Sequence, residues 1–207
     1  MLPSVSKNIW LNDTVFIIGG GPSLAGVDLQ RLQGKGVLLA VNEAYNKIPY
    51  CNALFTCDRL WFRHNVKTFD SRPDVLKFVA LPKDMVIPEF SGTLLERSRE
   101  DGLSYDPSSI RINGNSGFGA LNLAVLAGAK RIVLLGFDLK PTASVTHWHG
   151  GYIWFDKRNE TGMYPRWIRA FETVSKELYD MGVNVLNINK DSAIRCFDFI
   201  DFEDLCK

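Results

Sequence analysis

The run Thr14-Val-Phe-Ile-Ile-Gly-Gly-Gly-Pro-Ser-Leu24 joins a short apolar stretch to three glycines, a proline and a serine. Its apolar residues 15–18 are mostly β-branched, which is typical of a strand buried on both faces of a parallel sheet. The glycines can take a positive φ and let a ligand approach the backbone, while Pro22 and Ser23 stand where a helix would begin. We therefore predict a helix over 23–33 whose free amides and positive dipole end face an anion.

This glycine turn departs from two common phosphate-binding motifs. The dinucleotide fingerprint G-x-G-x-x-G lacks its third glycine here, at Leu24 and Ala25, and the Gly-Lys-Ser/Thr ending of a P-loop is also missing. A tight structural connection between a strand and a helix is therefore an alternative to a phosphate site, and the rest of the chain must decide between them.

The composition favours one compact domain without a strong electrostatic field. The chain has 207 residues, 46% of them hydrophobic, and a net charge of +1, so broad capture of nucleic acid or of a membrane surface is not expected. Its four cysteines lack metal-ligand spacing, which favours reduced thiols and a cytoplasmic protein. We find no leader-like start and no apolar run of about 18 residues, so secretion and membrane spanning are not expected.

Apolar runs alternate with helix-length segments along the chain. The predicted strands are 15–18, 37–41, 53–57, 76–81, 132–135 and 183–188, and the further predicted helices are 58–66, 118–127 and 165–181. This alternation predicts an α/β fold with a mainly parallel sheet and flanking helices, formed as a single domain over residues 1–207. Segments 82–110 and 140–163 have weak periodicity, and we interpret them as irregular and lid-like.

Glycines or polar side chains follow four of these apolar segments and Ile112, at positions where ligands bind in open parallel sheets. They are the turn Gly19, Gly20, Gly21, Pro22 and Ser23, then Asn42, Asp58, the turn Asn113-Gly-Asn-Ser-Gly117, and Asp138. The second turn repeats the logic of the first, so two helix starts are expected to hold one polyphosphate from both sides. The alternative for Asn42, Asp58 and Asn115 or Ser116 is a helix N-cap.

Two histidines lie in a glycine-flanked loop after Asp138. His147 and His149 flank Trp148, and a loop histidine within reach of Asp138 suits general base catalysis near neutral pH. The alternatives are a metal-binding pair, for which no further ligand follows at useful spacing, and a surface histidine without a role.

Several of these motifs together resemble known families. They are Gly19-Gly-Gly-Pro-Ser-Leu24, Val41-Asn42, Asn113-Gly-Asn-Ser-Gly117, Ala127-Gly-Ala-Lys-Arg-Ile-Val-Leu-Leu-Gly-Phe-Asp138 and Thr146-His147. Most of the chain resembles a family of small phage proteins, some labelled "norphogenetic". More distantly, the motifs resemble the bacterial CMP-sialic acid-dependent sialyltransferases and the archaeal 6-hydroxymethyl-dihydropterin pyrophosphokinase family, which share a Rossmann-like domain.

The resemblance implies roles for residues already singled out. Nucleotide binding would fall to Gly19, Gly21, Pro22, Ser23 and Asn42, phosphate binding to Asn115, Ser116 and Gly117, and the base would be His147. One departure concerns the donor: Leu139-Lys-Pro follows Asp138 where the sialyltransferases place a tyrosine, which argues against sialic acid as the donor sugar. A phage setting implies the cytoplasm of the infected host cell.

Three functions follow from these observations. The first is a transferase with a nucleotide or nucleotide-sugar donor, in particular a glycosyltransferase in which His147, assisted by Asp138, deprotonates an acceptor hydroxyl. The second is a pyrophosphokinase or nucleotidyltransferase in which Asp58 and Asp138 hold Mg²⁺ against a triphosphate. The third is a non-catalytic protein that binds a nucleotide. The acceptor and the oligomeric state stay open, a homo-oligomer being one option.

Overall fold

A computed structural model describes residues 4–207 except 86, 88–89, 141–147 and 149–156. These residues form one α/β domain around a nine-stranded sheet in which all neighbouring strands are parallel, in the order β6-β5-β4-β3-β2-β1-β7-β8-β9. The strands are β1 (Thr14–Ile18), β2 (Val37–Val41), β3 (Ala53–Thr56), β4 (Leu76–Leu81), β5 (Thr93–Ser98), β6 (Ser109–Arg111), β7 (Arg131–Leu135), β8 (Asn184–Asn187) and β9 (Asp198–Phe199). The predicted fold class is confirmed.

The centre of the sheet is β1, which lies between β2 and β7. Ile18 at its end is in register with Ala40 of β2 and Leu135 of β7. The chain proceeds from β1 to β6 on one side and from β7 to β9 on the other, so the strand order reverses at β1 and β7. The carboxyl ends at such a switch point are where open α/β sheets bind ligands.

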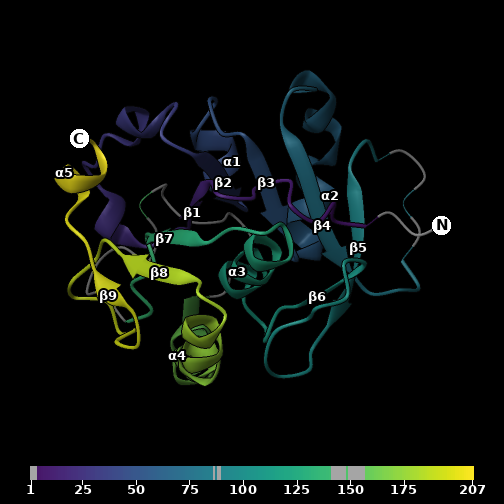
Figure 1. Ribbon diagram of the computed structural model, residues 1–207. Coiled ribbons are helices and arrows are strands. Elements are labelled where there is room, and N and C mark those ends of the chain that lie inside the picture. The colour runs from purple at the N-terminus through teal and green to yellow at the C-terminus, as the bar shows by residue number, and fades with distance from the viewer. Residues whose placement is uncertain (1–3, 86, 88–89, 141–147, 149–156) are drawn as a thin grey trace.

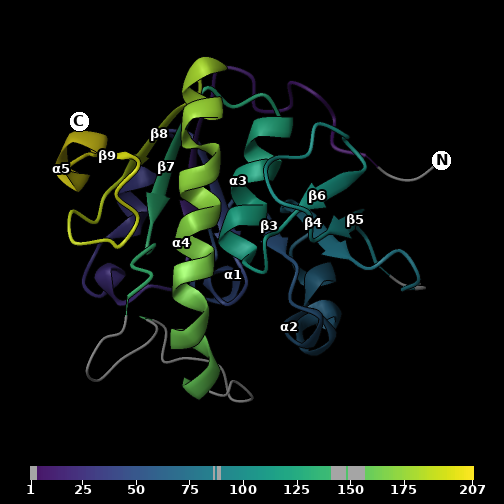
Figure 2. The same cartoon turned by 90° about the horizontal axis from the view of Figure 1, so that it is seen from below.

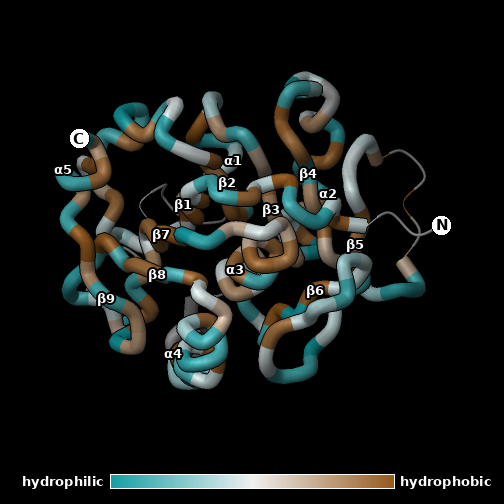
Figure 3. Tube along the Cα trace, in the orientation of Figure 1, coloured by the Kyte–Doolittle hydropathy of each residue, from teal (hydrophilic) through white to brown (hydrophobic). Residues whose placement is uncertain are grey.

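Helices cover both faces of the sheet (Figures 1 and 2). α3 (Ser116–Leu126) and α4 (Lys157–Asp180) lie on one face, while α1 (Ala44–Lys47), α2 (Arg59–Asn65) and the 3-10 helices η2 (Leu29–Leu32) and η3 (Val66–Ser71) lie on the other. Alternate strand residues face the two layers: Ile17 packs with α3, whereas Phe16 and Ile18 pack on the opposite side. Much of the strand region in the middle of Figure 3 is accordingly brown.

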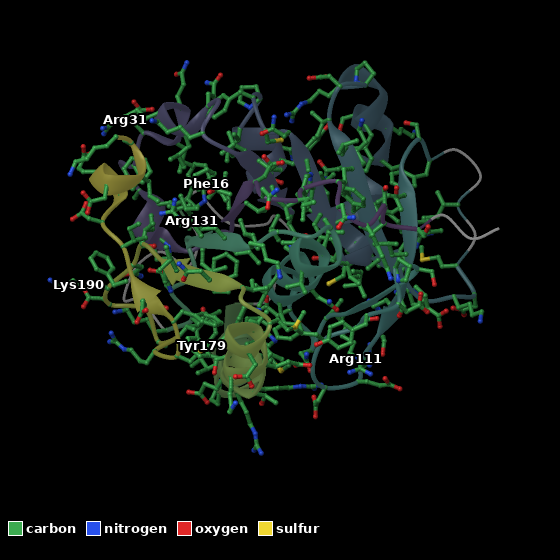
Figure 4. All side chains as sticks on the ribbon, viewed as in Figure 1. Phe16, Arg31, Arg111, Arg131, Tyr179 and Lys190 are labelled. Atoms are coloured by element: carbon green, nitrogen blue, oxygen red, sulfur yellow. The ribbon has the colours of Figure 1, made fainter. Side chains whose placement is uncertain are left out.

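The C-terminal segment closes one side of the domain with the short helix α5 (Phe202–Leu205). Arg31 donates to both carboxylate oxygens of Glu203 at 2.7 and 2.8 Å, beside α5 in Figure 4. Within the described part of the chain, the helices are all too short or too polar to cross a lipid bilayer.

The predicted helix over 23–33 is wrong. The chain instead forms two short 3-10 helices, η1 (Pro22–Leu24) and η2, which are separated at Gly26. Gly26 has φ +82° and Ala25 before it is extended, so the helical hydrogen-bond ladder cannot continue through this position. A three-residue helix has no appreciable dipole, so the helix dipole does not contribute to an anion site at this turn.

The two segments interpreted as irregular contain regular structure. Within 82–110, β5 and β6 extend the parallel sheet, but each buries a single residue fully, Leu95 and Ile110, so their polar sequences lack the apolar signal of a central strand. Within 140–163, α4 begins at Lys157 and continues through Pro165, where the prediction had it begin. Most of the remainder of that segment lies outside the described residues, and a lid role for either segment stays a prediction.

Candidate functional site

A cavity of about 470 Å³ lies beyond the carboxyl ends of the strands at the switch point. Its walls come from the ends of β1, β2, β3, β5 and β7 and from the starts of α3 and α4. Figure 2 shows the first turns of α4 reaching past this edge of the sheet. The size is in the range of small-molecule sites.

The structure brings most of the predicted site residues to this cavity. Those that line it are Gly19, Gly20, Gly21, Pro22, Asn42, Asp58, Asn115, Ser116, Gly117 and Asp138. Ser23 lies behind the wall, bonded to Asp138. His147 and His149 lie outside the described residues, so their predicted catalytic roles stay predictions, as do the binding roles of the others.

The first glycine turn is fastened by Asp138. The Ser23 backbone amide donates to Asp138 Oδ1 at 3.2 Å, and the Ser23 hydroxyl donates to Oδ2 at 2.8 Å. The Asn189 side-chain amide donates to Oδ1 at 2.9 Å. Burial raises the pKa of Asp138, and the hydrogen bonds from Ser23 oppose this shift. The amide predicted to hold a phosphate is therefore already bonded to a carboxylate of the protein.

The turn needs glycine because its backbone packs directly on the segment after β7. The Gly21 amide donates to the Gly136 carbonyl at 2.8 Å. A Cβ on Gly21 would lie 2.6 Å from that same carbonyl oxygen and would overlap the Asp138 carboxylate. Gly136 itself has φ +73°, in the left-handed region. Close packing between two backbones thus explains these glycines without a ligand.

Trp148 covers the carbonyl side of the same turn. Its indole Nε1 donates to the Gly19 carbonyl and its backbone amide to the Gly20 carbonyl, both at 3.0 Å. Trp148, which stands between the two predicted catalytic histidines in the sequence, is therefore hydrogen-bonded to the first glycine turn.

The second turn is capped by its own asparagine. Asn115 Oδ1 accepts from the amides of Gly117 at 2.6 Å and Phe118 at 3.1 Å, so it is the N-cap of α3. Ser116, the first residue of the helix, has its hydroxyl 3.1 Å from Cys57 Sγ at the cavity wall. Burial raises the pKa of Cys57 to about 11, so this thiol stays protonated at neutral pH.

The capping alternative holds for Asp58 and not for Asn42. Asp58 Oδ1 accepts from the amides of Leu60 at 2.8 Å and Trp61 at 3.1 Å and caps α2. Asn42 has φ +52°, and its Oδ1 is buried without a partner among the described residues. A buried amide oxygen that accepts no hydrogen bond can accept one from a ligand or from a water molecule.

Basic side chains dominate the charged lining and were not predicted. They are Arg97, Arg99, Lys140 and Arg166. No ion pair with a carboxylate is formed by any of these four within the described ranges. The two acidic residues of the lining, Asp58 and Asp138, are both occupied by hydrogen bonds to backbone amides. The cavity is therefore suited to an anionic ligand.

The start of α4 adds an aromatic wall. Tyr164 and Trp167 have ring centroids 5.7 Å apart, and both line the cavity. Trp167 is the first residue of the helical apolar spacing Trp167, Ala170, Phe171 and Val174 in the predicted helix 165–181. Its Nε1 is buried without a partner in the described structure, 3.6 Å from a Cβ placed on Gly114. Tyr164 stands one residue before the predicted start of the helix at 165, whereas α4 begins at Lys157. A prediction that extended the helix toward its N-terminus would have included Tyr164.

The described residues contain no group of three or more histidine, cysteine, aspartate or glutamate side chains arranged to hold a metal ion. Asp58 and Asp138 are thus not joined there by a third such ligand, and Mg²⁺ binding by this pair stays a prediction.

Comparisons with known proteins agree with the fold. The sequence matches no family model and no curated protein. The structure is similar to that of the MAf glycosyltransferase from Magnetospirillum magneticum AMB-1, with a TM-score of 0.56 and 14% identity over 97% of this chain. The chain spans only 35% of the length of that protein. It is also similar to a variant of the sialyltransferase CST-II in complex with CMP, with a TM-score of 0.50, 16% identity, and coverage of 94% of this chain and 88% of that one. At such low sequence identity, the structural similarity establishes a shared Rossmann-like fold and nothing further.

Proposed function

We propose that this protein is a glycosyltransferase that uses a nucleotide-activated sugar. The observation that carries the proposal is the cavity at the switch point, where basic side chains without carboxylate partners in the described structure meet the buried, unbonded Asn42 Oδ1 and Trp167 Nε1. Two glycosyltransferases with this fold, one of them bound to CMP, support the same function.

The roles proposed for the residues follow from their positions. Asn42, at the end of β2, would contact the base or ribose, and the Ser116 hydroxyl with Lys140 and Arg166 would bind the phosphate and stabilise it as it leaves. His147 would remove a proton from the acceptor hydroxyl while that oxygen attacks the anomeric carbon and the nucleoside phosphate departs. Asp138 would keep the first glycine turn in place, because Ser23 and Asn189 already occupy its carboxylate.

A thermal-shift screen tests the proposal. The panel is CMP, UDP, GDP, UDP-glucose, UDP-glucuronate, CMP-N-acetylneuraminate, ATP with Mg²⁺ and 6-hydroxymethyl-dihydropterin, each except the ATP–Mg²⁺ sample with and without EDTA. We expect stabilisation by at least one nucleotide or nucleotide sugar with chelator present, about 2.7 kcal/mol when the ligand is at 100 times its Kd. Stabilisation by ATP and Mg²⁺ alone would instead favour a pyrophosphokinase. Binding of a nucleotide sugar without its slow hydrolysis or transfer would favour a non-catalytic binding protein.

A further inference from the structure

Two arginines at the end of β5 lie apart from the switch point but in the same cavity. Arg97 is in β5 and Arg99 directly follows it. We infer that these two side chains form an anion subsite for a carboxylate or phosphate on the sugar portion of the substrate, distinct from the nucleotide phosphate. The inference rests on the proposed function, because it assigns part of the same cavity.

The position of Arg97 follows from strand alternation. Leu95 packs into the core on the α3 side of the sheet, and residues two apart in a strand share a face, so Arg97 is on that side too. Its guanidinium reaches back to β3, where Nη1 donates to the Cys57 carbonyl at 3.3 Å. Its Nε is buried and has no partner in the described structure. An unpaired buried donor on a charged group is costly unless an acceptor occupies the site.

The two glutamates adjacent in sequence to Arg97 and Arg99 are each paired with another basic side chain. Glu96 is directed to Lys83, at 3.8 Å, and Glu100 is bonded to Arg111, at 2.9 Å. Both acidic residues next to Arg97 and Arg99 in this part of the sheet are therefore paired elsewhere. The remaining positive charge faces the cavity, and guanidinium groups bind the planar oxygens of carboxylates and phosphates through paired N–H donors.

The subsite lies two strands away from the first glycine turn. Arg97 contacts the end of β3, which is separated from β1 by β2. Two strand spacings amount to about 10 Å. A nucleotide that spans the switch point and reaches Ser116, beside Cys57, would direct its transferred sugar or its acceptor toward Arg97 and Arg99. A negatively charged group on that sugar would then contact the guanidinium groups of both arginines.

The test compares matched charged and neutral sugars on Arg97→Gln, Arg97→Lys, Arg99→Gln and wild-type protein. Arg131→Gln is the control for loss of one positive charge, since Arg131 is exposed at the start of β7 (Figure 4). Arg99 is also exposed, so its variant should fold even where a change at the partly buried Arg97 is destabilising. Affinities are measured by calorimetry for CMP, UDP, UDP-glucose and UDP-glucuronate, and for CMP-N-acetylneuraminate.

Two arms separate the sources of the anion. In the first, the acid is on the donor: UDP-glucuronate should bind about tenfold or more tightly than UDP-glucose. In the second, the acid is on the acceptor: glucuronate or glucose 6-phosphate, but not glucose, should bind to protein saturated with CMP or UDP. We expect one arm to show the gain, Arg97→Gln and Arg99→Gln to remove most of it, Arg97→Lys to restore it in part, and Arg131→Gln to retain it.

Several outcomes would overturn the inference while leaving the proposed function intact. They are a nucleotide that binds without any gain from charge in either arm, a gain that survives both glutamine variants, and a loss of CMP or UDP affinity in Arg97→Gln as large as the loss for the acidic sugar. The last would place the nucleotide phosphate itself at Arg97. Absence of binding by every nucleotide in the panel would instead contradict the proposed function, and the subsite would fall with it.

Discussion

Ser23 and Asp138, which are 115 residues apart, are joined by the Ser23 hydroxyl, which donates to Asp138 Oδ2 at 2.8 Å, and by the Ser23 amide, which donates to Oδ1 at 3.2 Å. This pair fixes the turn after β1 against the segment after β7. The strand order of the sheet reverses between these two strands. Asp138 therefore acts first as a structural residue of the cavity wall.

We expect a double-mutant cycle on this pair to show coupling. Asp138→Asn places an amide group against the Ser23 donors and should lower the free energy of unfolding by about 1–3 kcal/mol. Ser23→Ala should cost about 1 kcal/mol, and the double variant should cost less than the sum. Urea unfolding measures all three, and strictly additive losses would contradict a direct interaction.

The pH dependence of stability should carry the signature of Asp138. Burial raises its pKa above the ordinary value of 3.8, so the folded protein binds this proton more readily than the unfolded chain. The stabilisation that comes from protonating Asp138 is fully present at pH values below the ordinary pKa. It is lost as the pH rises through the raised pKa of the folded protein. The free energy of unfolding of wild-type protein, relative to Asp138→Asn, should therefore increase as the pH is lowered from about 7 to about 4. A constant difference would show that this carboxyl is not perturbed.

Trp167→Phe should weaken nucleotide binding without affecting folding. The change keeps an aromatic ring at the cavity wall and removes Nε1–H, which has no partner in the described structure. We expect a loss of about tenfold in affinity for the best nucleotide of the panel if the ligand accepts from this donor. An unchanged melting temperature together with unchanged affinity would exclude a ligand contact at Nε1.

The two loop histidines are tested by kinetics. His147→Ala should reduce product formation by about 10²-fold or more while nucleotide affinity changes little, because a general base acts on the acceptor proton. His149→Ala, made in parallel, is expected to have the smaller effect. Full activity in both variants would remove histidine catalysis from the proposed mechanism.

Two glycine substitutions should have opposite effects on stability. Gly21→Ala should lower the free energy of unfolding by about 1–3 kcal/mol, because its Cβ would overlap Asp138 and approach the Gly136 carbonyl. Gly162→Ala should raise it by up to about 1 kcal/mol, because this exposed residue of α4 has open space where the Cβ would lie. Chemical denaturation compares the two directly, and equal effects would mean that the tight packing at Gly21 does not persist in solution.

Local sequence determined the centre of the fold. The apolar runs that end at Ile18 and Leu135 form strands that are buried on both faces. An uninterrupted apolar run of this length is enough to predict such a strand. Asp58 and Asn115 are helix N-caps, which was one of the two interpretations given for each. This could be predicted because an N-cap accepts from amides only two or three residues away. The positions of both glycine turns were equally evident.

Tertiary structure alone decided how these parts are used. Nothing local to Ser23 indicates that its amide donates to Asp138, a residue that is 115 positions away in the sequence. The edge strand β5 buries one residue fully, so its sequence carries little strand signal, and only pairing with β4 brings Arg97 to the cavity. Trp167 has the spacing of a core residue, yet α4 extends beyond the sheet at that end and turns it to the site. Periodicity reports which face of an element is buried, whereas the groups that meet across a cavity depend on contacts between distant segments.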